Sequence, residues 1–321
     1  MDRSNGYSAA YPIELLARNP IEVDEPAFVC ALAKRLGRVK ATGLVFLLED
    51  FPVQFREGTI PAQLALLGPV GPSAKRTDDI KKALQQSWAF PAAAQVYQAC
   101  SHMQLLTNMM SSPLSHQARR KIIANGLLAL LETTQVDLIY WAPTQQMLSP
   151  ADVVERYSDP RELANALHGF LNVRFFNISN SNGDMLMDTL GLNALGLTDF
   201  QVHYRGLEPD SVARFLYNLG AYAFEKGDVI DDGHTVDGVD KKARWTCRRE
   251  NSLVEPQRTC WTSTLANLSL SAIADSDGFI RPAARELDVS ARAIPSRCSA
   301  PATRFRTSNK RPSDLPTRST A

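Results

Sequence analysis

The stretch FLNVRFFNISNSNGDMLMDTL, from Phe170 to Leu190, decides the fold class of this 321-residue chain. Two apolar runs, Phe170 to Ile178 and Met185 to Leu190, flank the polar segment SNSNGD. Asn182-Gly183 within that segment predicts a tight hairpin, because primed turns need residues that tolerate positive φ. We therefore expect two adjacent antiparallel strands, which favours an α+β fold over a doubly wound parallel sheet.

Helical patterns lie on both sides of this hairpin. The clearest runs from Pro209 to Lys226 and is followed by Gly227, so proline opens it and glycine closes it. Its apolar side chains recur at helical spacing: Val212, Phe215, Leu216, Leu219, Tyr222 and Ala223. Similar patterns predict helices from Asp24 to Gly37, from Asp78 to Trp88, from Ser115 to Leu131 and after Ser149-Pro150. In the helix that follows Ser115, we expect Arg119, Arg120 and Lys121 to point largely outward.

Predicted strands are interleaved irregularly with these helices. Apolar runs from Gly43 to Leu48, from Cys100 to Met110 and from Val136 to Trp141 are typical of buried strands, and Tyr11 to Leu16 predicts a shorter one. Because strands and helices do not strictly alternate, the sequence favours an α+β fold with a mixed or antiparallel sheet and packed helices.

The chain divides into three expected parts. Residues 1–98 and 99–261 are expected to form two closely packed α+β halves. Residues 262–321 are expected to form a disordered basic tail. From Arg281 to Ala321 there are nine Lys/Arg and three Asp/Glu, and the composition is mainly Arg, Ser, Pro, Ala and Thr. Such a segment cannot bury enough apolar area to offset the entropy of ordering it.

Composition and charge indicate an ordinary globular protein. The chain is 44% hydrophobic and 21% charged, with a net charge of +1, so overall charge makes no case for nucleic acid or membrane binding. The sequence shows neither an apolar signal segment nor a run long enough to span a membrane. Five widely spaced cysteines include no CxxC pair, which argues against a zinc site and favours reduced thiols. We therefore expect a cytoplasmic protein without a metal or other cofactor.

One long stretch resembles a known family. Leu190 to Val236 read LGLNALGLTDFQVHYRGLEPDSVARFLYNLGAYAFEKGDVIDDGHTV, and Trp141 to Pro150 read WAPTQQMLSP upstream of it. These segments resemble the bacterial family catalogued as domain of unknown function 4261, over about residues 100–259. The resemblance implies an α+β domain, no known activity and no catalytic residue that can be carried over. It also implies a short strand after Arg258-Thr259, where this sequence departs into its Ser/Arg/Pro-rich tail.

No recognised catalytic motif is present. The sequence has no P-loop, no GxGxxG fingerprint and no GxSxG elbow. The acidic stretch from Asp228 to Asp240 lacks EF-hand spacing and predicts a solvated loop. The basic run from Lys241 to Arg249 surrounds Trp245, and basic residues next to an aromatic ring can bind single-stranded nucleic acid. The run is short, however, and it follows an acidic loop. Nucleic acid is therefore an unlikely partner.

A candidate binding site can be assembled from five polar and aromatic residues. His102 and His116 would approach each other if the strand from Cys100 leads directly into the helix from Ser115. Trp141, Gln145 and Gln146 would lie at the end of a neighbouring strand. Two imidazoles, an indole and two amides suit polar ligand binding or general acid–base chemistry. The alternative interpretation is a set of ordinary polar residues at strand ends.

The function predicted from these observations is a non-enzymatic module that binds another bacterial protein or a ligand. The alternative is an enzyme of unrecognised class that uses the His102, His116 and Trp141 region, although we assign no catalytic residue to it. A third hypothesis, contact with nucleic acid through the tail and the basic run, ranks lowest.

Overall fold

The hairpin predicted around Asn182-Gly183 forms part of a seven-stranded sheet. In the computed structural model, which describes residues 10–68, 77–159, 162–178, 181, 183–240, 243–265 and 280–282, β8 (Asn172–Ile178) pairs antiparallel with β9 (Asp184–Leu190). Gly183 has the positive φ of 83° that the turn requires, while Asn182 lies outside the described residues. The predicted hairpin is therefore confirmed.

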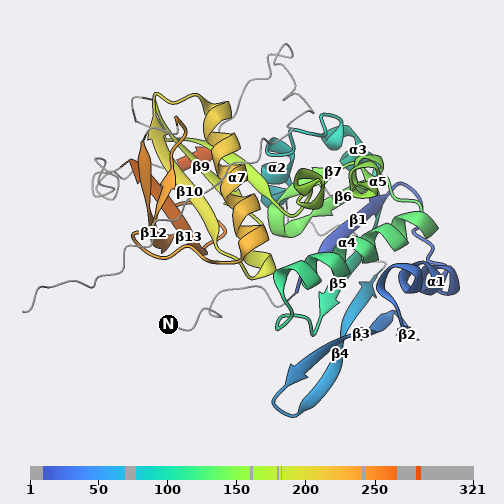
Figure 1. Ribbon diagram of the computed structural model, residues 1–321. Helices are drawn as coiled ribbons and strands as arrows, with labels where there is room; N and C mark the ends of the chain where they lie inside the picture. Colours follow the sequence, from blue (N-terminus) through green and yellow to red (C-terminus); the bar gives the residue numbers. More distant parts are fainter. Residues whose placement is uncertain are drawn as a thin grey trace, which may run out of the picture. The chain divides into compact units, whose positions relative to one another are not determined.

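This second sheet is mixed. Its strand order is β11-β12-β13-β10-β9-β8-β14, and β10 pairs parallel with β13 whereas the other neighbours are antiparallel. The remaining strands are β10 (Asp199–Arg205), β11 (Thr235–Asp237), β12 (Arg244–Asn251), β13 (Thr259–Leu265) and β14 (Ile280–Pro282). Helix α7 (Pro209–Lys226) packs along the sheet through its predicted apolar face (Figure 1).

The first sheet is entirely antiparallel, with strand order β2-β3-β4-β5-β1-β6-β7. Its strands are β1 (Ile13–Ala17), β2 (Val39–Thr42), β3 (Val45–Phe55), β4 (Gly58–Leu67), β5 (His102–Met109), β6 (Leu138–Trp141) and β7 (Gln146–Leu148). Strand β1 pairs with both β5 and β6, so this sheet takes strands from both sides of residue 98. The predicted α+β class, with mixed or antiparallel sheets, is confirmed.

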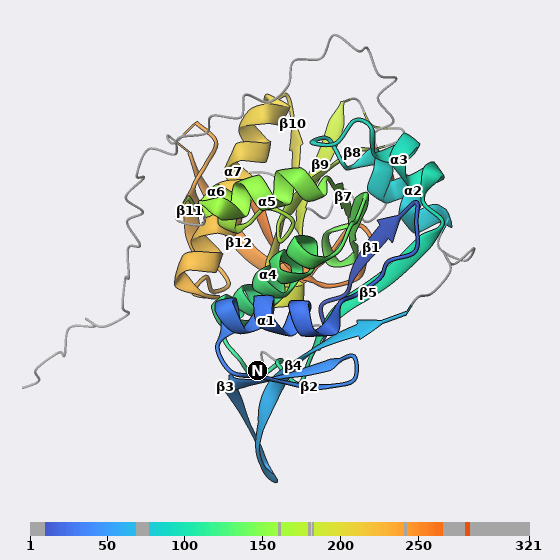
Figure 2. The same ribbon diagram turned by 90° about the vertical axis from the view of Figure 1, so that its right-hand side faces the viewer.

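Local signals place the helices of the first sheet. Asp24 caps α1 (Glu25–Leu36) by accepting a hydrogen bond from the Ala27 amide, and Ser115 caps α4 (His116–Thr133) in the same way. Helices α1 and α4 share the core on one face, while α2 (Thr77–Gln85) and α3 (Ala93–Ala99) contribute to a smaller apolar cluster around Leu16 and Tyr140. Helices α5 (Pro150–Ser158) and α6 (Leu163–Ala166) follow β7 (Figure 2).

The expectation that three basic residues of α4 point outward was wrong for two of them. Arg119 is buried, and Arg120 donates from Nε to the Ala166 carbonyl at 2.9 Å. The Arg120 guanidinium also lies 5.1 Å from the Tyr157 ring centre, so only Lys121 is exposed. The reason is that α4 contacts both its own sheet and the segments that join the two sheets, which leaves it little solvent-facing surface.

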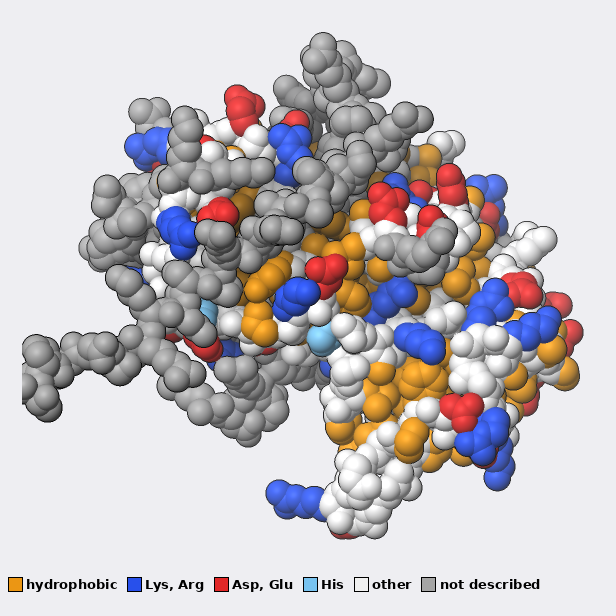
Figure 3. Space-filling model, in the orientation of Figure 1, with side chains coloured by type: hydrophobic (Ala, Val, Ile, Leu, Met, Phe, Trp, Pro, Cys, Tyr) orange, Lys and Arg blue, Asp and Glu red, His pale blue; other side chains and the backbone are white. Residues whose placement is uncertain are grey.

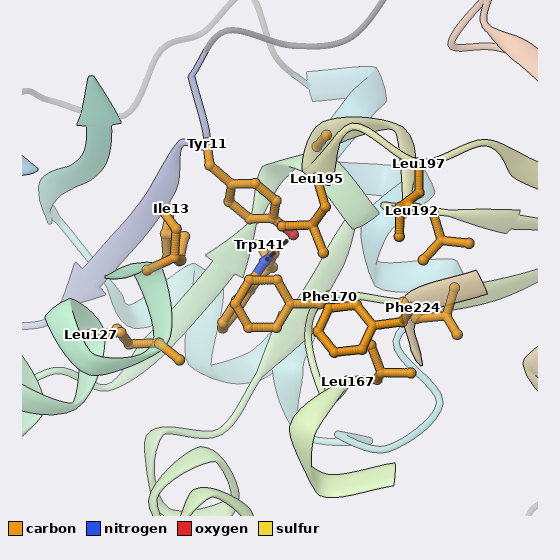
Figure 4. Close-up of a cluster of buried hydrophobic side chains, with 14 of the residues drawn as sticks. Tyr11, Ile13, Leu127, Trp141, Leu167, Phe170, Leu192, Leu195, Leu197 and Phe224 are labelled. Atoms are coloured by element: carbon orange, nitrogen blue, oxygen red, sulfur yellow. Dashed lines mark hydrogen bonds between the residues drawn. The ribbon is translucent and has the colours of Figure 1, made fainter. Parts of the chain in front are cut away.

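Aromatic packing makes the core continuous between the sheets. Tyr11, which precedes β1, and Trp141 of β6 meet Phe170, which precedes β8, with ring centres 5.4 and 5.0 Å from the Phe170 ring (Figure 4). The Trp141 indole donates to the Tyr11 hydroxyl at 3.0 Å, so the polar atoms of this cluster satisfy each other. A single hydrophobic core therefore holds both sheets.

Two parts of the expected tail, residues 262–265 and 280–282, belong to strands. Strand β13 continues to Leu265, and Ile280–Pro282 pair with β8 as strand β14, while the rest of the tail lies outside the described residues. Across the described part of the chain, no helix has both the length and the apolar character needed to cross a membrane.

Candidate functional site

The two histidines of the sequence-based site occupy different ends of the first sheet. His102 begins β5 opposite Ala17, whereas His116 begins α4, after the far end of β5. The eight residues of β5 extend roughly 25 Å, so the strand separates His102 from the turn that leads to His116. His116 instead lies with Nε2 2.7 Å from the Phe224 carbonyl oxygen of α7. The structure does not bring the two imidazoles together.

The other three predicted residues do lie together. Trp141 and Gln146 are partners in the β6–β7 pair, and Gln145 forms the turn between them with a left-handed φ of 54°. Trp141 is fully buried in the aromatic core. The Gln146 Oε1 atom is buried without a hydrogen-bond partner among the described residues. Gln145 Oε1 accepts a hydrogen bond from Arg174 at 3.1 Å, which leads to a set of charged residues that the sequence analysis missed.

Four charged side chains form a buried ionic cluster on the second sheet: Arg174, Asp188, Asp199 and Arg258. Arg174 makes a bidentate pair with Asp188, at 2.9 Å from Nε and 2.6 Å from Nη2. Arg258 joins both carboxylates, with Nη2 2.6 Å from Asp188 and Nε 3.1 Å from Asp199. The side chains are 3% exposed for each arginine and 0% for each aspartate. Two positive and two negative charges therefore balance each other out of contact with solvent.

The cluster fastens the segment between β12 and β13 onto the sheet. Arg258 Nη1 donates to the Pro256 carbonyl at 2.9 Å, and Arg174 Nη1 donates to the Glu255 carbonyl at 2.8 Å. Gln201 holds the same segment, donating to the Asn251 carbonyl and accepting from the Leu253 amide. Through Gln145, the cluster also binds the turn after β6. It thus joins three separate pieces of chain.

The chemistry of the cluster is that of a support and not of a reaction centre. Arg258 places all three guanidinium nitrogens on acceptors, including the Thr189 carbonyl at 2.7 Å from Nη2. Burial raises the pKa of Asp199, and the positive charge of Arg258 partly opposes this rise. Burial also raises the pKa of the neighbouring Cys260 thiol, which disfavours a reactive thiolate. We therefore assign the cluster a positioning role.

A sequence signal for the cluster existed. Arg174 and Asp188 each lie inside an apolar strand, at positions that pair directly across β8 and β9. A charge within a buried strand needs a partner of opposite sign nearby. Arg258 carries no such signal, because it lies 70 residues from Asp188 in the chain.

A second feature is a hairpin arm, which we define as residues 51–61 of β3 and β4. Strand β2 pairs with β3 only up to Leu48, and β5 pairs with β4 only from Gln63 onward. The arm strands beyond those points pair only with each other among the described residues, and the arm projects from the sheet (Figures 1 and 2). A register shift between Leu48 and Pro52 marks its base, where a bulge bends the strand.

One face of the arm is apolar. We define the arm face as Phe51, Val53, Phe55 and Ile60, of which Val53 and Ile60 are direct cross-strand partners. Val53 is 1% exposed and belongs to the core, whereas the other three are only partly buried. Figure 3 shows hydrophobic side chains gathered over the base of this hairpin, next to basic side chains. The opposite face carries Gln54 and Thr59, which hydrogen-bond to each other.

Other charged segments serve local structure. Asp228, from the acidic stretch, accepts hydrogen bonds from the Thr198 hydroxyl at 2.8 Å and the Trp261 indole at 3.3 Å. Trp245 is 3% exposed and packs edge-on against Phe215, so its ring is not available for stacking on a base. Within the described ranges, no group of three or more His, Cys, Asp or Glu residues is placed to hold a metal ion.

Comparison with known proteins identifies one similarity. Residues 188–262 match the family model described as Domain of unknown function (DUF4261). The match starts at Asp188 and includes Asp199 and Arg258, so three members of the buried ionic cluster lie within it. The expected resemblance is confirmed for this segment. No curated protein and no solved structure matches the chain.

Proposed function

We propose that this chain, which resembles a family of unknown function over much of its second sheet, is a non-enzymatic protein-interaction module of the bacterial cytoplasm. The observation that carries the proposal is the arm. It is a two-stranded projection whose partly exposed aromatic and aliphatic side chains share one face. An isolated two-stranded hairpin is marginally stable in water, so a projecting arm is costly to keep without a use.

The composition of the arm face suits recognition of a protein. Aromatic side chains dominate binding energy at protein interfaces, because they bury a large area with few rotatable bonds. Phe51 and Phe55 supply two such side chains within five residues. Val53 belongs to the core and the two rings pack partly buried against it, so their exposed parts lie on a positioned surface instead of a loose loop.

Site-specific photo-crosslinking followed by reconstitution tests the proposal. The full chain would carry p-benzoylphenylalanine at position 55 on the arm face, or at position 54 on the opposite face. We expect a protein adduct from position 55 and none from position 54. Equal adducts from both positions, or none from either, would contradict the proposal.

The crosslinked protein would then be purified and its affinity measured by calorimetry. Phe55→Ala should weaken binding about tenfold or more, as expected for a central aromatic contact, while Thr59→Ala should leave it unchanged. Urea unfolding of both variants would confirm that the fold is retained. An affinity insensitive to Phe55→Ala would remove the arm face from the interface.

A second candidate function is polar ligand binding, or an unrecognised enzymatic activity, at Trp141, Gln145 and Gln146. The supporting observation is the buried Gln146 Oε1 atom, because an unpartnered acceptor is costly and a ligand donor would satisfy it. His102 and His116 remain predicted members of this site, although β5 separates them. A screen of small polar compounds by thermal shift, repeated with Gln146→Leu, tests it. A compound that stabilises both proteins equally would count against this site.

A further inference from the structure

The way in which the arm can bind limits the class of partner that it accepts. This inference rests on the proposed function and concerns the chemistry of the partner. Pro52 and Pro61 lie directly opposite each other at the base of the arm. Proline has no backbone N–H and blocks strand pairing at its position. Each arm strand beyond them offers only three residues, Val53 to Phe55 and Gly58 to Ile60, so recognition by strand addition is disfavoured.

Side chains of the arm face are therefore the recognition elements, and their surroundings carry positive charge. Lys121 of α4 is exposed, and its Nζ lies 5.6 Å from the centre of the Phe51 ring. Arg56 is exposed in the turn at the arm tip. Among the described residues, neither Lys121 nor Arg56 has an ion-pair partner.

The helix that carries Lys121 adds to this potential. The first turn of α4 contains no acidic residue that would offset the charge of Lys121. The N-terminus of a helix is itself the positive end of the backbone dipole, so cations there are unfavourable for helix stability. Lys121, beside the Phe51 ring, is therefore the cation of α4 that can attract a carboxylate at the arm, because Arg120 is engaged by the Ala166 carbonyl and the Tyr157 ring.

The acidic residues at the base of the arm do not cancel this field at the arm face. Asp50, in the bulge, is held by Arg38 at 2.7 Å, and Glu49 lies 4.0 Å from the same guanidinium. Hydrogen bonds from Arg38 also hold the pKa of Asp50 below its usual value. Glu57 is exposed beside Arg56 at the tip and offsets part of its charge, so Lys121 is the cation at the base of the arm face.

We propose that the arm binds an acidic, apolar segment of another protein, with apolar side chains on Phe51, Phe55 and Ile60 and carboxylates toward Lys121 and Arg56. The apolar contact supplies affinity, and the flanking charges select the sign of the partner and speed its association. A basic segment would place like charges against Lys121 and is excluded by repulsion.

Two fluorescein-labelled synthetic peptides test this chemistry. Both would be 15-residue amphipathic sequences with the same Leu and Phe positions, one with Glu and the other with Lys at every polar position. Fluorescence anisotropy with the full chain should show the Glu peptide binding at least about tenfold more tightly at low salt. The preference should shrink in 0.5 M salt, because exposed charges are screened.

Matched variants locate the effect. Lys121→Glu should remove most of the preference for the Glu peptide, while Lys226→Glu, the same charge reversal on α7, should leave it unchanged. Equal binding of the two peptides, no binding of either, or equal effects of the two variants would overturn the acidic-segment proposal. If photo-crosslinking at position 55 still yields a specific partner in that case, the interaction function stands and only the charge of the partner is wrong. If neither experiment detects binding, both proposals fail.

Discussion

Burial should separate the energetic effects of two arginine–aspartate pairs that have the same bidentate geometry. Arg174 of β8 and Arg205 of β10 each make a bidentate pair with an aspartate of β9, Asp188 and Asp184 respectively. The Arg174 and Asp188 side chains are 3% and 0% exposed, whereas those of Arg205 and Asp184 are 59% and 16% exposed. The chemistry of the two pairs is the same, and the environment differs.

Replacing each arginine with methionine keeps an apolar stem and removes the charge. Arg174→Met leaves Asp188 with Arg258 as its remaining cation and removes the donor from Gln145 Oε1 and the Glu255 carbonyl. Breaking a buried pair from one side typically costs about 3–5 kcal/mol, because a desolvated charge is left poorly compensated. Arg205→Met should cost at most about 1 kcal/mol, because water solvates the remaining aspartate.

Urea unfolding of the full chain, followed by circular dichroism at low and high salt, measures both differences. High salt should reduce the small effect of Arg205→Met and leave that of Arg174→Met nearly unchanged. Equal losses of unfolding free energy for the two variants, or a loss below about 1 kcal/mol for Arg174→Met, would refute the reasoning that burial governs the cluster.

Three further predictions follow from packing, titration and thiol burial. Gly169→Ala should destabilise by about 2–5 kcal/mol in urea unfolding, because Gly169 has φ 78° and an added Cβ would lie 2.8 Å from the Trp141 ring; Gly206→Ala, at φ 71° with open space around it, should cost only about 1–2 kcal/mol. A hydrogen bond with His168 holds the pKa of Asp152 below its usual value, so the contribution of Asp152 to stability is present above about pH 4 and is lost as pH falls through the folded-state pKa. Asp152→Asn should therefore flatten this part of the curve of unfolding free energy against pH. A curve unchanged from wild type, or an equal effect of the exposed Glu155→Gln, would contradict this prediction. Iodoacetamide should label the exposed Cys30 in the native protein well before Cys247, whose thiol pKa is raised by burial, and mass spectrometry that finds equal labelling would disprove this order.

Elements with strong local signals could be predicted from the sequence. The caps at Asp24 and Ser115, the turn at Gly183 and the apolar face of α7 all lie where the sequence places them. Each depends on residues a few positions apart, so the chain encodes it without reference to its neighbours in space. Less distinct segments were harder: the strand predicted from Gly43 to Leu48 proved to be part of a longer bulged strand, β3, and β2 and α3 were not predicted.

The candidate site could be predicted only in part, because its residues are distant in the chain. Trp141, Gln145 and Gln146 were grouped correctly, since a turn of a few residues joins them. His102 was not brought to His116, because β5 runs its full length between them. The ionic cluster around Arg174 also needs Arg258, which lies 70 residues from Asp188 in the chain. No local sequence pattern predicts that Arg258 packs against these residues.

The sequence by itself determined the α+β class, the β8–β9 hairpin, the capped helices and the similarity to a family of unknown function. These properties follow from short-range periodicity, turn chemistry and local composition. Only the tertiary structure decided that β1 lies between β5 and β6, that Arg119 and Arg120 are buried, that four charges meet beneath the segment before β13, and that the arm extends beyond its neighbouring strands. Each of these outcomes depends on which segments, distant in the sequence, pack against each other and exclude water between them. That choice is made by the packing of the whole chain and not by any one segment of it.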